Sequence, residues 1–272
     1  MIREEFALHS AGTEASLSVF RWEDDEEYAR RIRPAIIVCT GGAYKMLSDQ
    51  ENQPMVAAFL AMGFHVASLR YSLTPVHWPK QLCELAESVA ILRENAEKWC
   101  IASDQIMVSG FSAGGHLAAS LGVFWYQPWL SELVGKSNES IRPNAMMLGY
   151  PVLVARENYH KGSFKNLLGD DFESRLSEVS LDLSVSKQTA PCFLWHTGED
   201  AAVSCDGTLK FIQKLRQFGV PFELHLFQKG RHSLALATEL TDIGKPGYQN
   251  ECVAQWTGQF YRWAHDFTDG LI

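Results

Sequence analysis

The sequence predicts an α/β fold with a mostly parallel central sheet and helices on both of its faces. Several apolar runs of strand length are continuous rather than alternating, which is typical of parallel strands buried on both faces. These runs alternate with helical stretches, the pattern of repeated strand–helix–strand units with right-handed crossovers. The 272 residues suffice for one large core, so we expect a single domain spanning residues 1–272.

The first half of the chain is predicted to contain an edge strand of alternating polarity, three buried strands and two helices. A charged connector from Glu23 to Arg33, which a solvated turn explains, follows the edge strand. A glycine loop from Thr40 to Tyr44 follows the first buried strand. The strands are expected at Ser16–Trp22, Ala35–Cys39, His65–Arg70 and Ile106–Ser109, and the helices at Pro54–Met62 and from Trp78-Pro79 to about Cys100.

The second half is predicted to contain further strands and helices of the same kind, interrupted by two excursions. Residues 125–141 mix aromatic and polar side chains and are expected to form a connection rather than core. Residues 152–189 show only short helical fragments, including Phe164 to Leu168, and are expected to form a small cap-like excursion at one edge of the sheet. The sequence leaves open whether either excursion is a true lid. The regular elements are expected at Ala145–Leu148, Pro191–His196, Ser204–Phe218, Phe222–Phe227 and Asn250–Phe267.

Composition and charge indicate which kinds of binding partner and which cellular location to expect for this protein. The chain has 46% hydrophobic and 21% charged residues and a net charge of −8, without clustered Lys and Arg, so neither nucleic acid nor a membrane is expected as a partner. Met1–Phe6 carries acids where a signal peptide is basic, and no apolar run reaches membrane-spanning length, so we expect a cytoplasmic protein. The six cysteines form no Cys-x-x-Cys pair, so neither disulfides nor a metal site is expected. The oligomeric state, monomer or homo-oligomer, stays open.

The pentapeptide Gly110-Phe111-Ser112-Ala113-Gly114 lies between a predicted strand and a stretch of small helix-forming residues. This strand, tight turn and helix order is what a nucleophile elbow requires, because a sharp and strained turn lifts the serine hydroxyl clear of the backbone. The two glycines let neighbouring backbone pass close to the turn. Ser112 is therefore the candidate nucleophile.

A serine hydroxyl needs a base, and imidazole suits that task when a carboxylate fixes its tautomer. Of nine histidines, His232 is the candidate, because it follows Gly230 in the loop after the last predicted strand. Asp200 is the preferred carboxylate because it sits at the turn of the loop that follows Trp195-His196, although Glu199 and Asp206 compete with it. The order Ser, Asp, His is the one that α/β-hydrolases use.

Backbone N–H groups must also stabilise the oxyanion that forms when an acyl carbonyl is attacked. Ala113, which follows the nucleophile, is expected to supply one donor, and Gly42 and Ala43 of the glycine loop the others. Taken alone, Gly41-Gly42 reads as an ordinary turn. Tyr44 and Trp125 are expected to wall the substrate pocket, with the alternative that these aromatic rings belong to the core.

Four motifs together resemble one family. They are Gly110 to Leu117, Gly41 to Tyr44, Trp195 to Asp200 and Gly230 to Leu234. The combination is similar to the α/β-hydrolase esterases of the hormone-sensitive-lipase-like and acetyl-xylan-esterase-like group, from about Ala35 to the end of the chain. The chain departs from the group at Thr40, where many relatives have His or Pro, and at Ala43, where many have a third Gly.

The resemblance implies an α/β-hydrolase fold, a catalytic triad of Ser112, Asp200 and His232, and carboxylesterase activity, in many relatives on short acyl groups of sugars. We therefore expect a serine carboxylesterase that needs no cofactor and takes a small-molecule ester, such as an acetylated sugar or oligosaccharide. Two alternatives stay open on sequence alone. They are a serine peptidase or amidase of the same fold, because the same triad serves both reactions, and a catalytically idle homologue that binds a ligand in the pocket.

Overall fold

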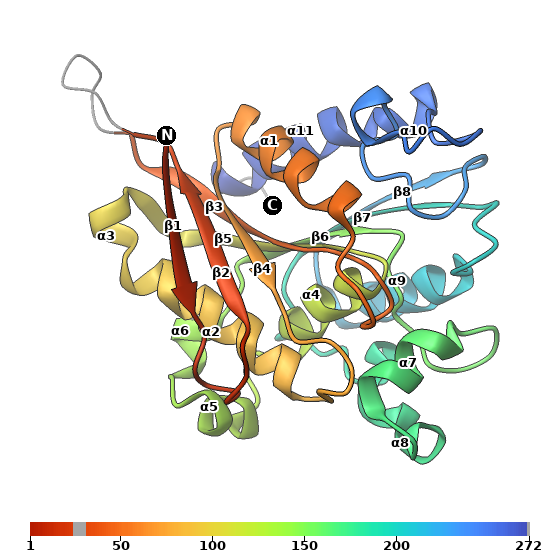
Figure 1. The fold of residues 1–272 in the computed structure, drawn as a ribbon, viewed down its shortest axis with the longest axis horizontal. Coiled ribbons are helices and arrows are strands. Elements are labelled where there is room, and N and C mark those ends of the chain that lie inside the picture. The colour runs from red at the N-terminus through yellow and green to blue at the C-terminus, as the bar shows by residue number, and fades with distance from the viewer. Residues whose placement is uncertain (24–30, 271–272) are drawn as a thin grey trace.

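The computed structural model describes residues 1–23 and 31–270, which form an α/β structure around one eight-stranded sheet (Figure 1). The strand order across the sheet is β1-β2-β4-β3-β5-β6-β7-β8. Strands β3 to β8 run parallel to one another, and β1 and β2 are antiparallel to their neighbours. The strands are β1 (Ile2–Ala7), β2 (Ser16–Arg21), β3 (Arg33–Cys39), β4 (His65–Arg70), β5 (Ile101–Phe111), β6 (Ala145–Gly149), β7 (Cys192–Thr197) and β8 (Phe222–Phe227).

The edge of the sheet differs from the prediction. The strand expected at the edge, Ser16–Trp22, is β2 and lies second, because Ile2–Ala7 forms an outer strand that was not predicted. Three charged residues in the six of β1 obscured the strand signal. Charged side chains suit an edge strand because they discourage pairing with another chain. Most of the predicted connector from Glu23 to Arg33 lies outside the described residues.

Helices cover both faces of the sheet, as predicted (Figure 1). One face packs against α1 (Gln53–Ala61) and α11 (Trp256–Thr268), whose Phe59 and Phe260 belong to one buried cluster with strand residues such as Ile36. The opposite face packs against α2 (Lys80–Glu94), α4 (Ala113–Phe124) and α9 (Asp206–Phe218). The shorter helices are α3 (Ala96–Trp99), α5 (Pro128–Val134), α6 (Asn138–Ile141), α7 (Lys161–Leu168), α8 (Phe172–Val179) and α10 (Glu251–Ala254).

The long helix expected from Trp78-Pro79 to Cys100 is two helices. Asn95 interrupts it with a backbone φ of −99° and ψ of 8°, and its side-chain amide donates to the carbonyl of Ile91. An asparagine side chain that bonds to nearby backbone competes with the helical hydrogen bonds, which explains the break. The second piece, α3, ends at Cys100 in the left-handed conformation.

The first excursion is part of the core, contrary to the prediction of a mere connection. Residues 125–141 contain α5 and α6, and their side chains Leu130, Val134 and Ile141 are buried against the cluster that covers α2 and α4. The aromatic and polar mixture hid this role because the apolar positions fall on short helices of four and seven residues.

The second excursion carries α7 and α8 beside the carboxyl ends of the strands. The carbonyl of Leu167 on α7 accepts a hydrogen bond from the backbone N–H of Trp78, at 2.9 Å. Phe164 and Val179 are fully buried, so the excursion is packed onto the rest of the molecule as the predicted cap-like segment. The side-chain amide of Asn166 on α7 also donates to the carbonyl of Ala43, so α7 lies close to the loop that follows β3, where part of the predicted site is located.

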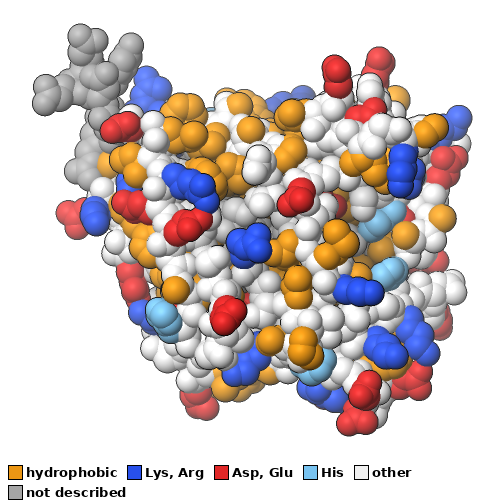
Figure 2. Space-filling view, in the orientation of Figure 1, with side chains coloured by type: hydrophobic (Ala, Val, Ile, Leu, Met, Phe, Trp, Pro, Cys, Tyr) orange, Lys and Arg blue, Asp and Glu red, His pale blue; other side chains and the backbone are white. Residues whose placement is uncertain are grey.

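Acidic and basic side chains are interspersed on the face drawn in Figure 2, which shows no large basic patch on that side. Within the described residues, no helix combines the length and the apolar character needed to cross a membrane.

Candidate active site

Ser112 occupies the sharp turn between β5, which ends at Phe111, and α4, which begins at Ala113. Its φ of 52° and ψ of −119° lie in a region that residues other than glycine rarely adopt. The turn is held on both sides, because the Ser112 N–H donates to the carbonyl of Gly149 and its carbonyl accepts from Val152. Its small neighbours are required, since a Cβ on Gly114 would lie 2.1 Å from the carbonyl oxygen of Cys39. The sequence motif therefore forms the strained elbow that it predicts.

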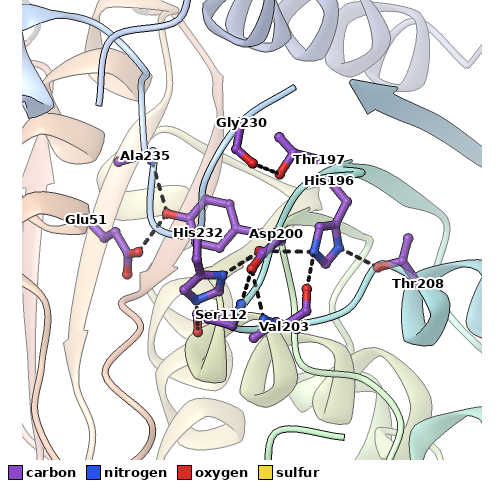
Figure 3. Close-up of polar contacts among 12 residues, drawn as sticks. Glu51, Ser112, His196, Thr197, Asp200, Val203, Thr208, Gly230, His232 and Ala235 are labelled. Atoms are coloured by element: carbon purple, nitrogen blue, oxygen red, sulfur yellow. Dashed lines mark hydrogen bonds and ion pairs between the residues drawn. The ribbon is translucent and has the colours of Figure 1, made fainter. Parts of the chain in front are cut away.

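Ser112, His232 and Asp200 form one hydrogen-bonded chain (Figure 3). His232 Nε2 lies 2.9 Å from Ser112 Oγ, and His232 Nδ1 lies 2.6 Å from Asp200 Oδ2. The three residues come from the loops after β5, β7 and β8, which meet at the carboxyl edge of the parallel strands. This geometry allows the imidazole to accept the serine proton while the carboxylate holds its other nitrogen.

The Asp200 carboxylate is buried and well supplied with donors. Its Oδ1 accepts hydrogen bonds from the backbone N–H groups of Ala202 and Val203, both at 2.9 Å. Burial alone would raise the pKa of Asp200, but hydrogen bonds from His196, His232 and Val203 outweigh it and hold the pKa well below its usual range. The carboxylate therefore stays ionised beside the imidazole. The competing acids, Glu199 and Asp206, are exposed, and the structure places Asp200 beside His232.

His196 braces the loop that carries Asp200, as its position at the end of β7 suggests. Its Nε2–H points at the carbonyl of Val203, 3.0 Å away, and at Asp200 Oδ2, 3.3 Å away. Its Nδ1 accepts from the hydroxyl of Thr208 on α9, at 2.8 Å. The imidazole is completely buried, so it fixes the carboxylate without meeting solvent or substrate.

The predicted oxyanion loop lies against Ser112. A Cβ added to Gly41 would be 3.0 Å from the Ser112 Cβ, so the backbone of this loop passes directly over the elbow. In the part of the chain that the structure describes, the backbone N–H groups of Gly42, Ala43 and Ala113 are not taken up by other hydrogen bonds. Backbone donors without a partner in the described structure therefore lie in the loop next to Ser112 and at the start of α4, where an oxyanion would need them.

Two contacts from outside the loop fix its backbone. The side-chain amide of Asn166 on α7 donates to the carbonyl of Ala43 at 2.8 Å. The hydroxyl of Tyr71 donates to the carbonyl of Thr40 at 2.6 Å. Ala43 and Tyr44 both have positive φ, 56° and 58°, a conformation that needs such support in residues with side chains.

The aromatic residues assigned to the substrate pocket lie elsewhere, which corrects that prediction. Tyr44 is 1% exposed, and its hydroxyl bonds to His116 Nδ1, 2.7 Å away in the core. Trp125 is 6% exposed and lies at the far end of α4 from Ser112, where its indole N–H donates to the carbonyl of Gln188. Apolar packing decided both positions, so the alternative that these rings belong to the core holds.

Three residues that contact the site were not predicted from the sequence. They are Asn166, which holds the oxyanion loop, and Glu51 and Tyr150, which hydrogen-bond to each other in the buried space behind it. Tyr150 comes directly after β6, and position at the carboxyl end of a parallel strand was the available signal. Asn166 and Glu51 belong to no motif.

The chain matches a known protein family and several curated proteins in sequence. It matches the BD-FAE family over residues 25–215. It is 30% identical over 218 residues to the endo-1,4-beta-xylanase B of Butyrivibrio fibrisolvens, an alignment that covers 76% of this chain and 33% of that protein. The chain spans between 33% and 49% of the length of the four curated relatives that it matches.

Solved structures resemble the chain over nearly its full length. The acetyl ester-xyloside bifunctional hydrolase of Caldicellulosiruptor lactoaceticus has a TM-score of 0.82 and 31% identity, with 94% of this chain and 89% of that chain covered. The carboxylesterase Cest-2923 of Lactobacillus plantarum has a TM-score of 0.88 and 28% identity, with 100% and 99% covered. The eight-stranded, mostly parallel sheet with helices on both faces is consistent with an α/β-hydrolase fold. The chain therefore belongs to the BD-FAE family of α/β-hydrolase esterases.

Proposed function

We propose that the protein is a serine carboxylesterase that hydrolyses short-chain acyl esters, above all acetyl esters of small sugars or oligosaccharides. The observation that carries this proposal is the continuous contact from Ser112 Oγ through His232 to Asp200, at 2.9 and 2.6 Å. These distances suit proton transfer, and the carboxylate selects the imidazole tautomer whose Nε2 is free to act as base. No cofactor takes part in the proposed reaction.

In the proposed first half-reaction, His232 Nε2 takes the proton of Ser112 as Oγ attacks the ester carbonyl carbon. The carbonyl oxygen becomes an oxyanion and receives hydrogen bonds from the backbone N–H groups of Gly42, Ala43 and Ala113. The imidazolium formed on His232 is stabilised by the Asp200 carboxylate, which stays ionised. His232 then gives its proton to the departing alcohol, and the acyl group remains on Ser112.

In the second half-reaction, water replaces the alcohol. His232 takes a proton from the water molecule, whose oxygen attacks the acyl carbon of the acyl-enzyme. The same three N–H groups receive the second oxyanion, and the proton returns to Ser112 Oγ as the carboxylic acid leaves. Each group thus serves twice in the same position, so the site needs no rearrangement between the two halves.

The preference for short acyl groups is supported by the space beside the triad. A cavity of about 20 Å³ is lined by residues that include Val152, Val154, His160, Val203 and Gly207. The backbone N–H of Val152 donates to the carbonyl of Ser112 and that of Val203 to Asp200, so the cavity lies next to residues that hold the triad, although no triad residue lines it. We propose that the acyl group points toward this small cavity, which leaves little room for a long chain. The relative from Caldicellulosiruptor lactoaceticus, named for acetyl esters, supports the same class of substrate.

The test is the hydrolysis of p-nitrophenyl acetate by the wild type and by Ser112→Ala. We expect the variant to stay folded and to lose activity by roughly a thousandfold or more, as triad deletions do. A fluorophosphonate probe should label the wild type and leave Ser112→Ala unlabelled. Turnover by the variant above a tenth of the wild-type rate would exclude Ser112 as the nucleophile.

Parallel assays separate the alternatives. Cleavage of acetylated xylo-oligosaccharides with no cleavage of acetyl-amino-acid anilides supports an esterase. The reverse preference would make the protein an amidase. An absence of labelling and of both activities would make it a binding protein that keeps the triad without using it.

A further inference from the structure

One buried carboxylate contacts two of the segments that build the site. Glu51 ends the short 3-10 helix η1 (Asp49–Glu51) and is 1% exposed. Its Oε2 accepts the backbone N–H of Gly41, at 2.5 Å, in the loop that carries Gly42 and Ala43. Its Oε1 accepts the hydroxyl proton of Tyr150, at 2.7 Å. Both carboxylate oxygens are therefore committed to groups beside the reacting centre.

Tyr150 continues this contact to the loop that carries His232. Its hydroxyl oxygen accepts the backbone N–H of Ala235 at 3.1 Å, three residues beyond His232 (Figure 3). Its ring lies against the imidazole of His232, with the ring centroids 5.0 Å apart and the planes at 70°. A continuous path thus runs from Gly41 through Glu51 and Tyr150 to Ala235.

The residue before Glu51 holds the same loop at two further points. The side-chain amide of Gln50 donates to the carbonyl of Ser233 at 3.0 Å and to that of Thr241 at 2.7 Å. Ser233 and Ala235 have positive φ, 62° and 51°, so this loop needs external support to keep its shape. The 3-10 helix therefore contacts the His232 loop both directly and through Tyr150.

We propose that Glu51 is a positioning residue that fixes the oxyanion loop and the His232 loop relative to each other. This inference rests on the proposed function, because it assigns the two loops their parts in the reaction. A carboxylate accepts from Gly41 and Tyr150 at once, whereas an amide in its place accepts from one and presents an N–H₂ group to the other. Loss of this double contact would move the oxyanion donors relative to the imidazole, and small misplacements of catalytic groups lower the reaction rate strongly.

A second buried carboxylate provides a matched control. Glu84 on α2 is completely buried and accepts from the N–H and hydroxyl of Ser72 and from the hydroxyl of Thr13. For both acids, burial is the main cause of a raised pKa, which hydrogen bonds partly offset. Glu84 has the same chemistry as Glu51 but contacts neither loop of the site. A purely structural role for Glu51 predicts that the two Gln variants behave alike.

The experiment compares Glu51→Gln, Tyr150→Phe, the double variant and Glu84→Gln. For each, we would measure the second-order rate of fluorophosphonate labelling of Ser112, kcat and KM for p-nitrophenyl acetate, and Tm. Glu51→Gln should lower the labelling rate and kcat by roughly tenfold or more, while KM stays within about threefold of the wild type. The reason is that misplaced donors reduce the stabilisation of the transition state more than they reduce substrate binding. Glu84→Gln should lower Tm and leave the labelling rate and kcat within about twofold.

The double variant tests the path itself. If Glu51 acts through Tyr150, the loss in the double variant should be no greater than in the worse single variant. Tyr150→Phe keeps the ring against His232 and removes only the hydroxyl, so it gives the same test should Glu51→Gln fail to fold. An unchanged labelling rate in Glu51→Gln, equal losses in Glu84→Gln, or fully additive losses would each overturn the inference.

The labelling rate depends on Ser112, His232 and the oxyanion donors and not on the natural substrate. A wild type that is labelled but cleaves no ester would therefore contradict the proposed function while leaving the role of Glu51 measurable. A wild type that cleaves esters, with Glu51→Gln labelled equally fast, would contradict the inference alone.

Discussion

The side-chain amide of Asn166 donates a hydrogen bond to the backbone carbonyl of Ala43, 2.8 Å away and 123 positions apart in the sequence. This contact joins the second excursion to the loop that carries two of the proposed oxyanion donors. It fixes the peptide plane that follows Ala43, at a residue whose φ of 56° is unfavourable without support. The cap-like segment therefore holds the backbone of this loop through the side chain of Asn166.

Asn166→Ala is expected to lower kcat for p-nitrophenyl acetate by roughly tenfold, less than the loss from deleting an oxyanion donor, because the donors remain but are held less firmly. Asn138→Ala is the matched control. Asn138 likewise donates its side-chain amide to a backbone carbonyl, that of Trp125, at the end of α4 remote from Ser112. This control should keep kcat within about twofold, and equal losses in both variants would contradict a specific role for Asn166.

Asp200→Asn should slow ester hydrolysis by about a thousandfold or more, because an amide next to His232 Nδ1 favours the wrong imidazole tautomer. Glu199→Gln changes the exposed neighbouring acid and should leave kcat nearly unchanged. Steady-state kinetics on both variants decide between the two acids. A severe loss in Glu199→Gln with an active Asp200→Asn would reverse the assignment.

Acyl-chain preference can be measured with p-nitrophenyl esters of two to twelve carbons. We expect kcat/KM to be far higher for acetyl and propionyl esters than for octanoyl or longer esters, because the small cavity proposed for the acyl group offers little apolar room for added methylenes. Val154→Ala, which enlarges this cavity, should raise the relative rate for butanoyl esters several-fold. Val185→Ala, at an equally buried valine outside the cavity, should not. A maximum at eight carbons or beyond would make the enzyme lipase-like.

His116 should contribute to the pH dependence of stability. Burial lowers its pKa from 6.5 to about 4 in the folded chain, so folding favours the neutral ring. The contribution of His116 to the free energy of unfolding is fully present above pH 6.5. It is lost as the pH falls from 6.5 to 4, and the total loss is roughly 3 kcal/mol. In urea unfolding between pH 7.5 and 4.5, the free energy of unfolding should therefore fall more steeply with decreasing pH in the wild type than in His116→Gln. His9→Gln, at an exposed histidine, should keep the wild-type slope, and equal slopes in all three would contradict the prediction.

Much of the fold was predictable because its signals are local. The continuous apolar runs at β3, β4, β6 and β7 identify buried parallel strands within a few residues each. The elbow at Ser112 is equally local, since one pentapeptide between a strand and a helix specifies it. The missed strand β1 shows the limit of such signals, because charged edge positions are determined by the neighbouring strand rather than by their own pattern.

The sequence by itself determined the parallel sheet, the elbow, and the loops at the strand ends that carry Ser112, Asp200 and His232. Only the tertiary structure decided that Asp200, rather than Glu199, lies beside the imidazole, and that Tyr44 is buried against His116. It also decided that Glu51 contacts Gly41 and, 99 positions away, Tyr150. The physical reason is range. Strand and turn preferences act between neighbours in the chain, whereas these contacts depend on how loops after different strands pack at one edge of the sheet, and no local pattern encodes that packing.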